Sequence, residues 1–455
     1  MPRKTHPVSP EDHTSAWLNL ARAKTAEHSR RMLSPRLVGR LLAINESTLK
    51  ASLTNVKVGD LCALRTGLAD QSEYAEVLSV DQTGSVLMPF GEPGKFSLRT
   101  HVEAVGGRHE IRVGPQLLGR VLNGFGDLID EGPAMTGGVS RSVSNTAPLA
   151  LDRERINEPM PSGVRAIDGL TTLGRGQRIG VFAPAGTGKS TLFGMMARGC
   201  SADVVVLALI GERGREVREF LEREIDEHTR SRCVTVVATA DRSPGERFKA
   251  AAVAMTVAEA FREQGKQVLV LIDSLTRVCR AHRDVLLGLG RAPVRGGYPA
   301  AVMTELPRLL ERAGPGKVGS ITGIFTVLTE GDGTLDLLGE EIRSLIDGHI
   351  ELSRRLAQHQ HYPAVDVLRS ISRLMTTVVP PQHKAAAGRM LSLLAAYEEA
   401  ELLIQVGEYK PGADKLVDEA VRKKDLFKDF LRQPVHERSD FAQTVARLMK
   451  IVSPE

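Results

Sequence analysis

The pattern of apolar and polar positions changes three times along the chain. Between residues 36 and 104, short apolar segments alternate with turn residues such as Val58-Gly59-Asp60 and Gly91-Glu92-Pro93-Gly94. Strands that recur about every 8–12 residues, with turn residues between them, are typical of a small barrel. We therefore expect an N-terminal β-barrel domain over residues 36–104.

Between residues 105 and 378, apolar runs alternate with helical stretches. Five of these runs are nearly apolar on both faces: Arg178–Ala183, Val204–Ile210, Cys233–Ala240, Gln267–Asp273 and Gly319–Leu328. Such strands, interleaved with helices, indicate a parallel sheet that is covered on both sides. This pattern predicts a central α/β domain over residues 105–378.

Residues 379–455 are poor in strand patterns, and the segment His383–Ile404 has helical spacing. We expect a helical C-terminal domain there. Residues 1–35 look like a basic arm with a single candidate helix at Ser15–Arg31, whose apolar stripe around Trp17 is thin. That helix is equally consistent with a docking element and with a frayed tail.

The composition is that of a soluble globular protein, with 42% apolar and 25% charged residues. The longest apolar run has seven residues, whereas a membrane span needs about 20, and the N-terminus lacks the apolar segment of a secretory signal. None of the four cysteines has metal-site spacing. We expect a cytoplasmic protein with buried, reduced thiols.

The net charge of +5 is concentrated at the N-terminus, because residues 1–40 hold eight Lys/Arg against three Asp/Glu. The rest of the chain is close to neutral. A nucleic-acid-binding protein usually carries a basic face on its folded part, so this distribution does not call for one. The arm is suited to an acidic partner or to anionic lipid.

The strongest chemical motif follows the first buried strand of the central domain. It consists of Ala183, Pro184, Ala185, Gly186, Thr187, Gly188, Lys189, Ser190 and Thr191. A strand, a glycine-containing loop and a helix N-terminus form an anion site, because backbone N–H groups and the helix dipole point at phosphates. Lys189 is expected to reach the β/γ-phosphates of a nucleotide and Ser190 to bind Mg²⁺. The usual motif opens with glycine, and Ala183 is a mild departure from it.

Two carboxylates end buried strands of the same sheet. Asp273 ends the run that contains Val268–Ile272, and it fits a second Mg²⁺ anchor or, alternatively, a residue that caps the strand. Glu212 follows Val204–Ile210 at the edge where ligands of parallel sheets bind. It is suited to activate the attacking water, or to form a structural ion pair with Arg213 or Arg215.

Together these motifs resemble a known family. The segments GERGREVREF (211–220), VLVLIDSLTR (268–277) and PAVDVLRSIS (363–372) are similar to those of bacterial type III secretion ATPases. Flagellar export ATPases and the catalytic subunit of rotary ATP synthases share them. The resemblance covers most of residues 36–430. It implies a central RecA-like P-loop ATPase domain with ATP and Mg²⁺ as cofactors.

The resemblance also implies individual roles. Glu212 matches the glutamate that polarises water, and Arg213 matches an arginine that contacts phosphate. Tyr362 matches the aromatic that stacks on adenine, although a core tyrosine is the alternative. Arg373 matches an arginine finger that enters the neighbouring subunit's site, although an interface ion pair is the alternative. Val278 departs from the family, which usually has an aromatic there.

By resemblance, the function is Mg-dependent ATP hydrolysis that energises protein export, releasing substrates from chaperones and promoting their unfolding. The expected partners are copies of the chain in a homohexamer, a stator or regulator protein at the N-terminal arm, and a stalk protein in the central channel. By resemblance, the basic loop with Arg291, Arg295 and Tyr298 faces that channel, where it would contact an acidic substrate or stalk surface; a solvated loop without such a contact is the alternative. Chaperone–substrate complexes are expected at the C-terminal helices, and the secretion apparatus at the cytoplasmic face of the inner membrane.

Three alternatives stay open. A flagellar export ATPase would share every motif. A hexameric nucleic-acid translocase would need aromatics on the barrel for base stacking, and residues 36–104 contain only Tyr74, Phe90 and Phe96. The third alternative is a non-catalytic module that binds nucleotide only to hold the subunits of a ring together. The intact set Lys189, Glu212, Asp273 and Arg373 disfavours it.

Overall fold

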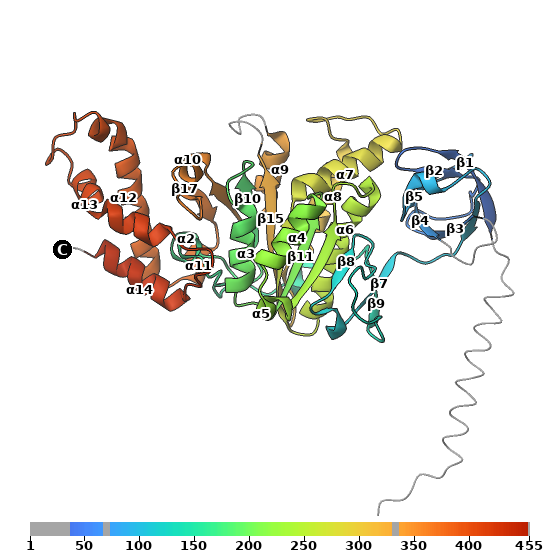
Figure 1. Ribbon diagram of the computed structural model, residues 1–455, viewed down its shortest axis with the longest axis horizontal. Coiled ribbons are helices and arrows are strands. Elements are labelled where there is room, and N and C mark those ends of the chain that lie inside the picture. Colours follow the sequence, from blue (N-terminus) through green and yellow to red (C-terminus); the bar gives the residue numbers. More distant parts are fainter. Residues whose placement is uncertain (1–36, 67–72, 330–335, 454–455) are drawn as a thin grey trace, which may run out of the picture.

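The computed structural model describes residues 37–66, 73–329 and 336–453. It shows three parts in a row: a barrel, a central sheet with helices on both faces, and a group of helices at the C-terminal end (Figure 1). This arrangement confirms the expected fold class. The basic arm and its candidate helix at Ser15–Arg31 lie outside the described residues.

The N-terminal part is a closed six-stranded barrel with the order β1-β2-β5-β4-β3-β6. Its strands are β1 (Val38–Ile44), β2 (Leu49–Ala51), β3 (Leu61–Arg65), β4 (Glu73–Asp81), β5 (Gly84–Pro89) and β6 (His101–Ala104), with a short 3₁₀ turn, η1 (Pro93–Lys95), before β6. Alternate residues such as Leu41, Val77 and Leu87 point inward and are fully buried. Closure pairs every strand on both sides, as the short, turn-separated segments predict.

The central sheet has the order β17-β16-β10-β15-β13-β11-β12-β8, and β14 pairs at the side of β15. The strands are β8 (Val121–Asn123), β10 (Arg178–Ala183), β11 (Val204–Ile210), β12 (Cys233–Ala238), β13 (Gln267–Asp273), β14 (Gly314–Pro315), β15 (Ser320–Leu328), β16 (Gly348–Leu352) and β17 (Val365–Ser372). The five apolar runs are its five central strands, and all five are parallel. Strand β17 at one edge is antiparallel to its neighbour β16.

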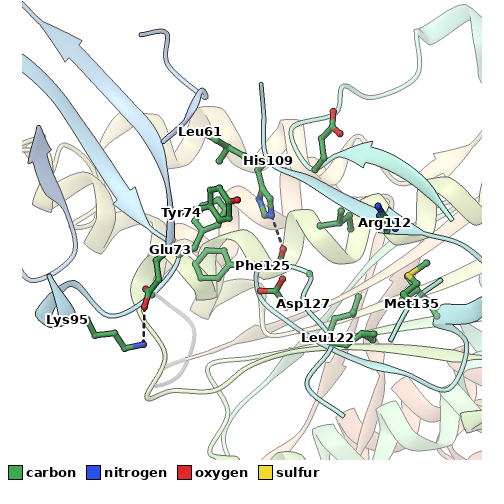
Figure 2. A pocket seen from close by; sticks show the side chains of 17 residues that line it. Leu61, Glu73, Tyr74, Lys95, His109, Arg112, Leu122, Phe125, Asp127 and Met135 are labelled. Atoms are coloured by element: carbon green, nitrogen blue, oxygen red, sulfur yellow. Dashed lines mark hydrogen bonds and ion pairs between the residues drawn. The ribbon is translucent and has the colours of Figure 1, made fainter. Parts of the chain in front are cut away.

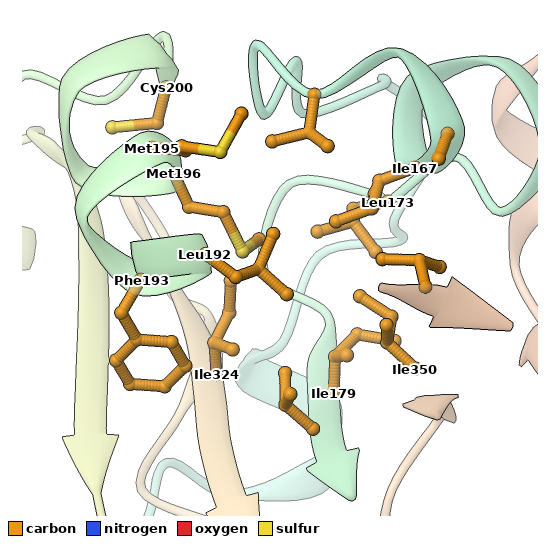
Figure 3. Packing of buried hydrophobic residues seen from close by; sticks show 14 of the residues in the cluster. Ile167, Leu173, Ile179, Leu192, Phe193, Met195, Met196, Cys200, Ile324 and Ile350 are labelled. Carbon is orange, nitrogen blue, oxygen red and sulfur yellow. The ribbon is translucent and has the colours of Figure 1, made fainter. Parts of the chain in front are cut away.

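Helices cover both faces of this sheet. The helices of the central part are α2 (Arg165–Leu170), α3 (Lys189–Gly199), α4 (Gly214–Arg223), α5 (Glu227–Arg230), α6 (Pro244–Arg262), α7 (Leu275–Gly288), α8 (Ala300–Leu310), α9 (Leu337–Leu345), α10 (Arg354–Gln358) and α11 (Met375–Val378). Helices α2, α3 and α4 share one buried cluster with the sheet, and α6 to α9 share the other. Figure 3 shows Leu192 and Met196 of α3 beside Ile179 and Ile324 of the sheet. This packing fixes the first turn of α3 over the sheet edge.

The C-terminal part consists of α12 (Pro381–Gln405), α13 (Lys415–Leu431) and α14 (Phe441–Val452). It packs on α2 through Phe430, which is fully buried and lies over Gly169. Arg165 reinforces this contact, because its Nε donates to the carbonyl of Phe430 over 2.9 Å. The expected helical character of this part is confirmed, and α12 contains the segment His383–Ile404.

The barrel meets the central part beside the ribbon of β7 (Glu110–Val113) and β9 (Val139–Ser142), near the short turn η2 (Pro115–Leu117). A further short turn, η3 (Ala150–Asp152), lies elsewhere, where Asp152 pairs with Lys317. The ring of Phe90 stacks on Phe125, with centroids 4.4 Å apart. His109 contacts the carbonyl of Phe125 through Nε2 over 2.8 Å. A cavity of about 660 Å³ lies here (Figure 2). None of its lining residues belongs to the phosphate loop.

All four cysteines are buried free thiols. Burial raises the pKa of the Cys279 thiol to about 12. That value leaves the thiol protonated and unreactive at neutral pH, which agrees with the expected structural role. None of the helices in the described part of the chain has the length and apolarity that crossing a bilayer requires.

Candidate functional site

The phosphate loop has the backbone that its sequence predicts. It runs from Ala183 at the end of β10 to Lys189 at the start of α3. Gly186 and Gly188 have φ values of +80° and +83°, a left-handed conformation that glycine adopts without strain. The Thr187 hydroxyl donates to the Pro184 carbonyl over 2.8 Å and closes the loop. The first N–H groups of α3 therefore face the loop's interior, where an anion is favoured.

The structure brings Lys189, Glu212 and Asp273 together. The Lys189 Nζ lies 2.5 Å from Asp273 Oδ1 and 3.2 Å from Glu212 Oε1. Strand pairing explains the meeting, because β11 and β13 are parallel neighbours in which Leu209 pairs with Asp273. Their carboxyl ends therefore lie at the same sheet edge as the loop after β10. The side chains are 4–14% exposed, so the charges interact in a partly dehydrated site.

The charges in this cluster perturb one another. Burial alone would lower the pKa of Lys189, but the carboxylates of Asp273 and Glu212 outweigh it and raise the pKa above the usual lysine value. Burial also raises the pKa of Glu212, and Asp273 adds to this, whereas Lys189 and Arg277 oppose it. Lys189 is thus firmly cationic, and Glu212 is a stronger base than an exposed glutamate.

Two further residues of the site carry no assignment from the sequence. Arg277, in the first turn of α7, donates from Nη2 to Glu212 Oε2 over 3.2 Å. Thr326 on β15 donates to Asp273 Oδ1 over 2.9 Å. The sequence could have indicated Arg277, because it comes only four residues after Asp273 and therefore lies close to the same end of the sheet. Nothing in the sequence signals Thr326, because its contact depends on the pairing of β13 with β15.

Tyr362 lies beside the phosphate loop. A Cβ placed on Gly188 would approach its ring to 3.4 Å, so the loop backbone and the half-buried ring are in close proximity. Tyr362 precedes β17, whose antiparallel direction puts its first residues at the phosphate-loop edge of the sheet. The location is suitable for an aromatic ring that stacks on a base.

Arg373 lies at the end of the sheet opposite to the phosphate loop, where β10 begins. It follows the last residue of β17, and its N–H donates to the carbonyl of Asp347 over 3.0 Å. Asp347 in turn accepts from the N–H of Arg178, the first residue of β10, over 3.0 Å. The phosphate loop begins at the other end of β10, about 17 Å away at 3.3 Å per residue. The exposed side chain of Arg373 therefore cannot reach the phosphate loop of its own chain.

Arg213 is not part of the cluster. It is the N-cap residue of α4, its side chain is 78% exposed, and it pairs with Glu216 over 3.0 Å. The alternative in which Glu212 pairs with Arg213 or Arg215 is wrong for this structure, because Arg215 pairs with Glu219 and Glu212 pairs with Lys189 and Arg277. The phosphate contact of Arg213 stays a prediction.

The donor set fits Mg²⁺ that arrives with a nucleotide. No group of three or more His, Cys, Asp or Glu side chains in the described ranges forms a ready metal cage. Asp273 supplies a carboxylate, and Ser190, exposed in the first turn of α3, supplies a hydroxyl. Mg²⁺ is usually bound by one or two protein oxygens together with substrate phosphates. Ser190 and Asp273 are thus chemically suitable ligands.

Comparison with known proteins settles the family. Residues 163–372 match the ATP synthase alpha/beta family, nucleotide-binding domain, and residues 379–450 match the T3SS EscN ATPase C-terminal domain. The type 3 secretion system ATPase of Xanthomonas euvesicatoria is 47% identical over 91% of this chain and 94% of its own length. The chain belongs to the type 3 secretion system ATPases. It is therefore an ATP-hydrolysing enzyme of protein secretion.

Two further relatives place the chain within the wider family. The assembled ATPase EscN from enteropathogenic E. coli, solved in complex with its central stalk EscO, has a TM-score of 0.84 and 44% identity. The match covers 91% of this chain and all of that one. The flagellum-specific ATP synthase of Bacillus subtilis is 40% identical over 88% of this chain and 91% of its own length. The secretion ATPase is thus the better match, and the flagellar enzyme is a relative.

The barrel gives no support to a nucleic-acid translocase. Of its three aromatics, Phe96 is buried in the barrel core and Phe90 is stacked on Phe125. Tyr74 is 45% exposed. A single tyrosine does not make the succession of stacking surfaces that single-stranded nucleic acid needs.

Proposed function

We propose that this chain hydrolyses ATP in a pocket shared by two copies of itself. The observation that supports this proposal is the division of the site between two sheet edges. Lys189, Glu212, Asp273 and Tyr362 lie around the phosphate loop, whereas Arg373 lies about 17 Å away at the other edge. Arg373 can therefore assist phosphoryl transfer only at the phosphate loop of a second copy.

Each residue of the pocket has a distinct task. Lys189 leaves its carboxylate partners to bind the β/γ-phosphates, and the Tyr362 ring packs on adenine. Glu212 accepts a proton from water as the water oxygen attacks the γ-phosphorus and the bond to the bridging oxygen breaks. The neighbour's Arg373 balances the charge on the transferring phosphoryl group, an effect of about 10³–10⁵ in rate in other enzymes. Mg²⁺ held by Ser190 and Asp273 would neutralise phosphate charge.

Such a division makes a head-to-tail ring of identical subunits. The edge with Arg373 contacts the phosphate-loop edge of the next copy, so the interface is heterologous, and it closes into a ring when the rotation permits. We expect a hexamer. Because every site is completed by a neighbour, hydrolysis depends on assembly.

The ring would couple hydrolysis to export at the cytoplasmic face of the inner membrane. The loop after α7 carries exposed Arg291 and Arg295, which suit an acidic stalk surface in the channel. The end of α12 exposes Leu402, Leu403 and Val406, which suit a chaperone–substrate complex. A stator or regulator would bind the basic arm over residues 1–35. Deleting that arm should abolish co-purification of the regulator, and retained binding would place the contact elsewhere.

Site-directed variants test the chemistry. Glu212→Gln should retain ATP binding and lose about 10²–10⁴-fold in turnover, the usual contribution of a general base. Lys189→Ala should lose both binding and turnover. Glu222→Gln is the matched control, because Glu222 belongs to an exposed ion pair with Arg218 on α4. Unchanged turnover in the first two variants would overturn the assignment.

A further inference from the structure

Thr326 is a buried hydroxyl next to the proposed metal-binding carboxylate. It lies on β15 with an exposed fraction of 0%. Strands β13 and β15 are parallel and pair Ile272 with Phe325, so the next step along both strands brings Thr326 beside Asp273. The contact is therefore built into the sheet register and does not depend on a loop.

The hydroxyl has one proton and two acceptors within reach. The Thr326 Oγ1 lies 2.9 Å from Asp273 Oδ1 and 3.4 Å from the carbonyl oxygen of Ile272. The carboxylate oxygen is the nearer acceptor, and a hydrogen bond to a charged group is stronger than one to a carbonyl. The Thr326 hydroxyl therefore donates its hydrogen bond to Asp273 Oδ1. Lys189 Nζ contacts the same Oδ1 over 2.5 Å. Within the described residues, both of these contacts fall on one oxygen of the carboxylate.

This arrangement matters most once nucleotide binds. The terminal torsion of an aspartate is soft, so a carboxylate rotates unless its oxygens are held. In the structure, Lys189 and Thr326 hold Oδ1 together. When Lys189 moves to the phosphates, as the proposed function requires, Thr326 keeps its contact because it is fixed in the adjacent strand.

We propose that Thr326 is a positioning residue that fixes Oδ1 of Asp273 and so directs Oδ2 toward the cation that accompanies ATP. The inference rests on the proposed role of Asp273. A hydroxyl is suited to this task, because it donates a hydrogen bond to the carboxylate without neutralising the charge that attracts the cation. Outer partners of this kind typically change metal affinity by about 10–100-fold.

The test is Mn²⁺ binding to the assembled, full-length protein with a non-hydrolysable ATP analogue, followed by electron paramagnetic resonance. Thr326→Val keeps the shape and the strand preference and removes the hydroxyl. We expect Mn²⁺ affinity to fall about tenfold. Affinity for the analogue without metal should stay at the wild-type value, which also shows that the variant is folded. Thr326→Ser should recover affinity to within about threefold of wild type.

Two controls make the outcome decisive. Thr322→Val removes another buried hydroxyl of β15, one that accepts from the Gly176 N–H over 2.9 Å, and should leave Mn²⁺ affinity unchanged. Asp273→Asn tests the underlying assignment. If Asp273→Asn weakens Mn²⁺ binding and Thr326→Val does not, the role of Thr326 is refuted while the proposed function stands. If Asp273→Asn has no effect, the assignment of Asp273 itself fails. Equal losses in the Val and Ser variants would also overturn the role of Thr326, since packing alone would then explain them.

Discussion

The buried ion pair between the barrel and α6 offers a quantitative test of how the barrel is held. Lys249 Nζ lies 2.8 Å from Oε1 and 2.6 Å from Oε2 of Glu76 on β4. The side chains of the lysine and the glutamate are 8% and 10% exposed. Lys249→Met removes the cation and strands the carboxyl in a site with little water. Breaking a buried pair in this way costs about 3–5 kcal/mol.

The size of this cost comes from the charge that stays behind in the buried site. Glu76→Leu combined with Lys249→Met removes both charges and should cost less than Lys249→Met alone.

Hydrogen exchange of the amides in β4 and α6 measures this cost locally, which a global unfolding curve of a three-part protein does not. Lys95→Met is the matched control, since Lys95 and Glu73 form an exposed pair in the same barrel, 3.7 Å apart, worth at most about 1 kcal/mol. The reasoning is refuted if Lys249→Met costs no more than Lys95→Met, or if the double variant costs as much as Lys249→Met alone.

Three further predictions follow from the site and its supports. Glu212 must be ionised to accept a proton, so its raised pKa shifts the loss of activity at acidic pH to a higher pH. Arg277→Gln removes a cation that lowers this pKa. In a pH–rate profile of this variant, activity should therefore be lost at a still higher pH. Gly188→Ala should weaken ATP binding at least several-fold in a titration. The φ of +83° at this position strains any residue other than glycine by about 1 kcal/mol or more, and the new Cβ would lie 3.4 Å from the Tyr362 ring. Wild-type affinity in this variant would contradict the close approach of loop and ring. Phe430→Ala should destabilise the contact of the C-terminal helices with α2 by about 3–5 kcal/mol, seen as faster proteolysis of α12–α14, whereas Leu426→Ala, at a residue 51% exposed on the same helix, should have little effect.

Much of the fold follows from the apolar pattern. The five buried strands of the central sheet were recognisable because residues such as those of Val204–Ile210 are buried on both faces. Strands β16 and β17 at the edge escaped recognition, since the exposed residues Arg369 and Ile371 break the apolar run of β17. Strand β8 has only three residues, too few for a periodic signal.

Some residues of the site could likewise be predicted from the sequence, and others could not. The phosphate loop, Glu212 and Asp273 were visible because each follows a buried strand, and parallel strands end at one edge. The contact of Thr326 was not visible, because it depends on which strand lies next to β13. The separation of Arg373 from its own phosphate loop depends on the antiparallel direction of β17, which no local pattern encodes.

Mixing two inactive variants tests the shared pocket most directly. Glu212→Gln lacks the base but supplies an intact Arg373, and Arg373→Ala lacks the finger but has an intact phosphate loop. In an equimolar mixture of separately purified variants that have exchanged subunits, some pockets combine a wild-type Glu212 with a wild-type Arg373 from the neighbour. We expect ATP hydrolysis to rise to roughly a quarter of the wild-type rate, the fraction of such pockets under random, independent mixing. Activity that stays at the level of the separate variants after confirmed subunit exchange would show that the two residues do not meet across an interface.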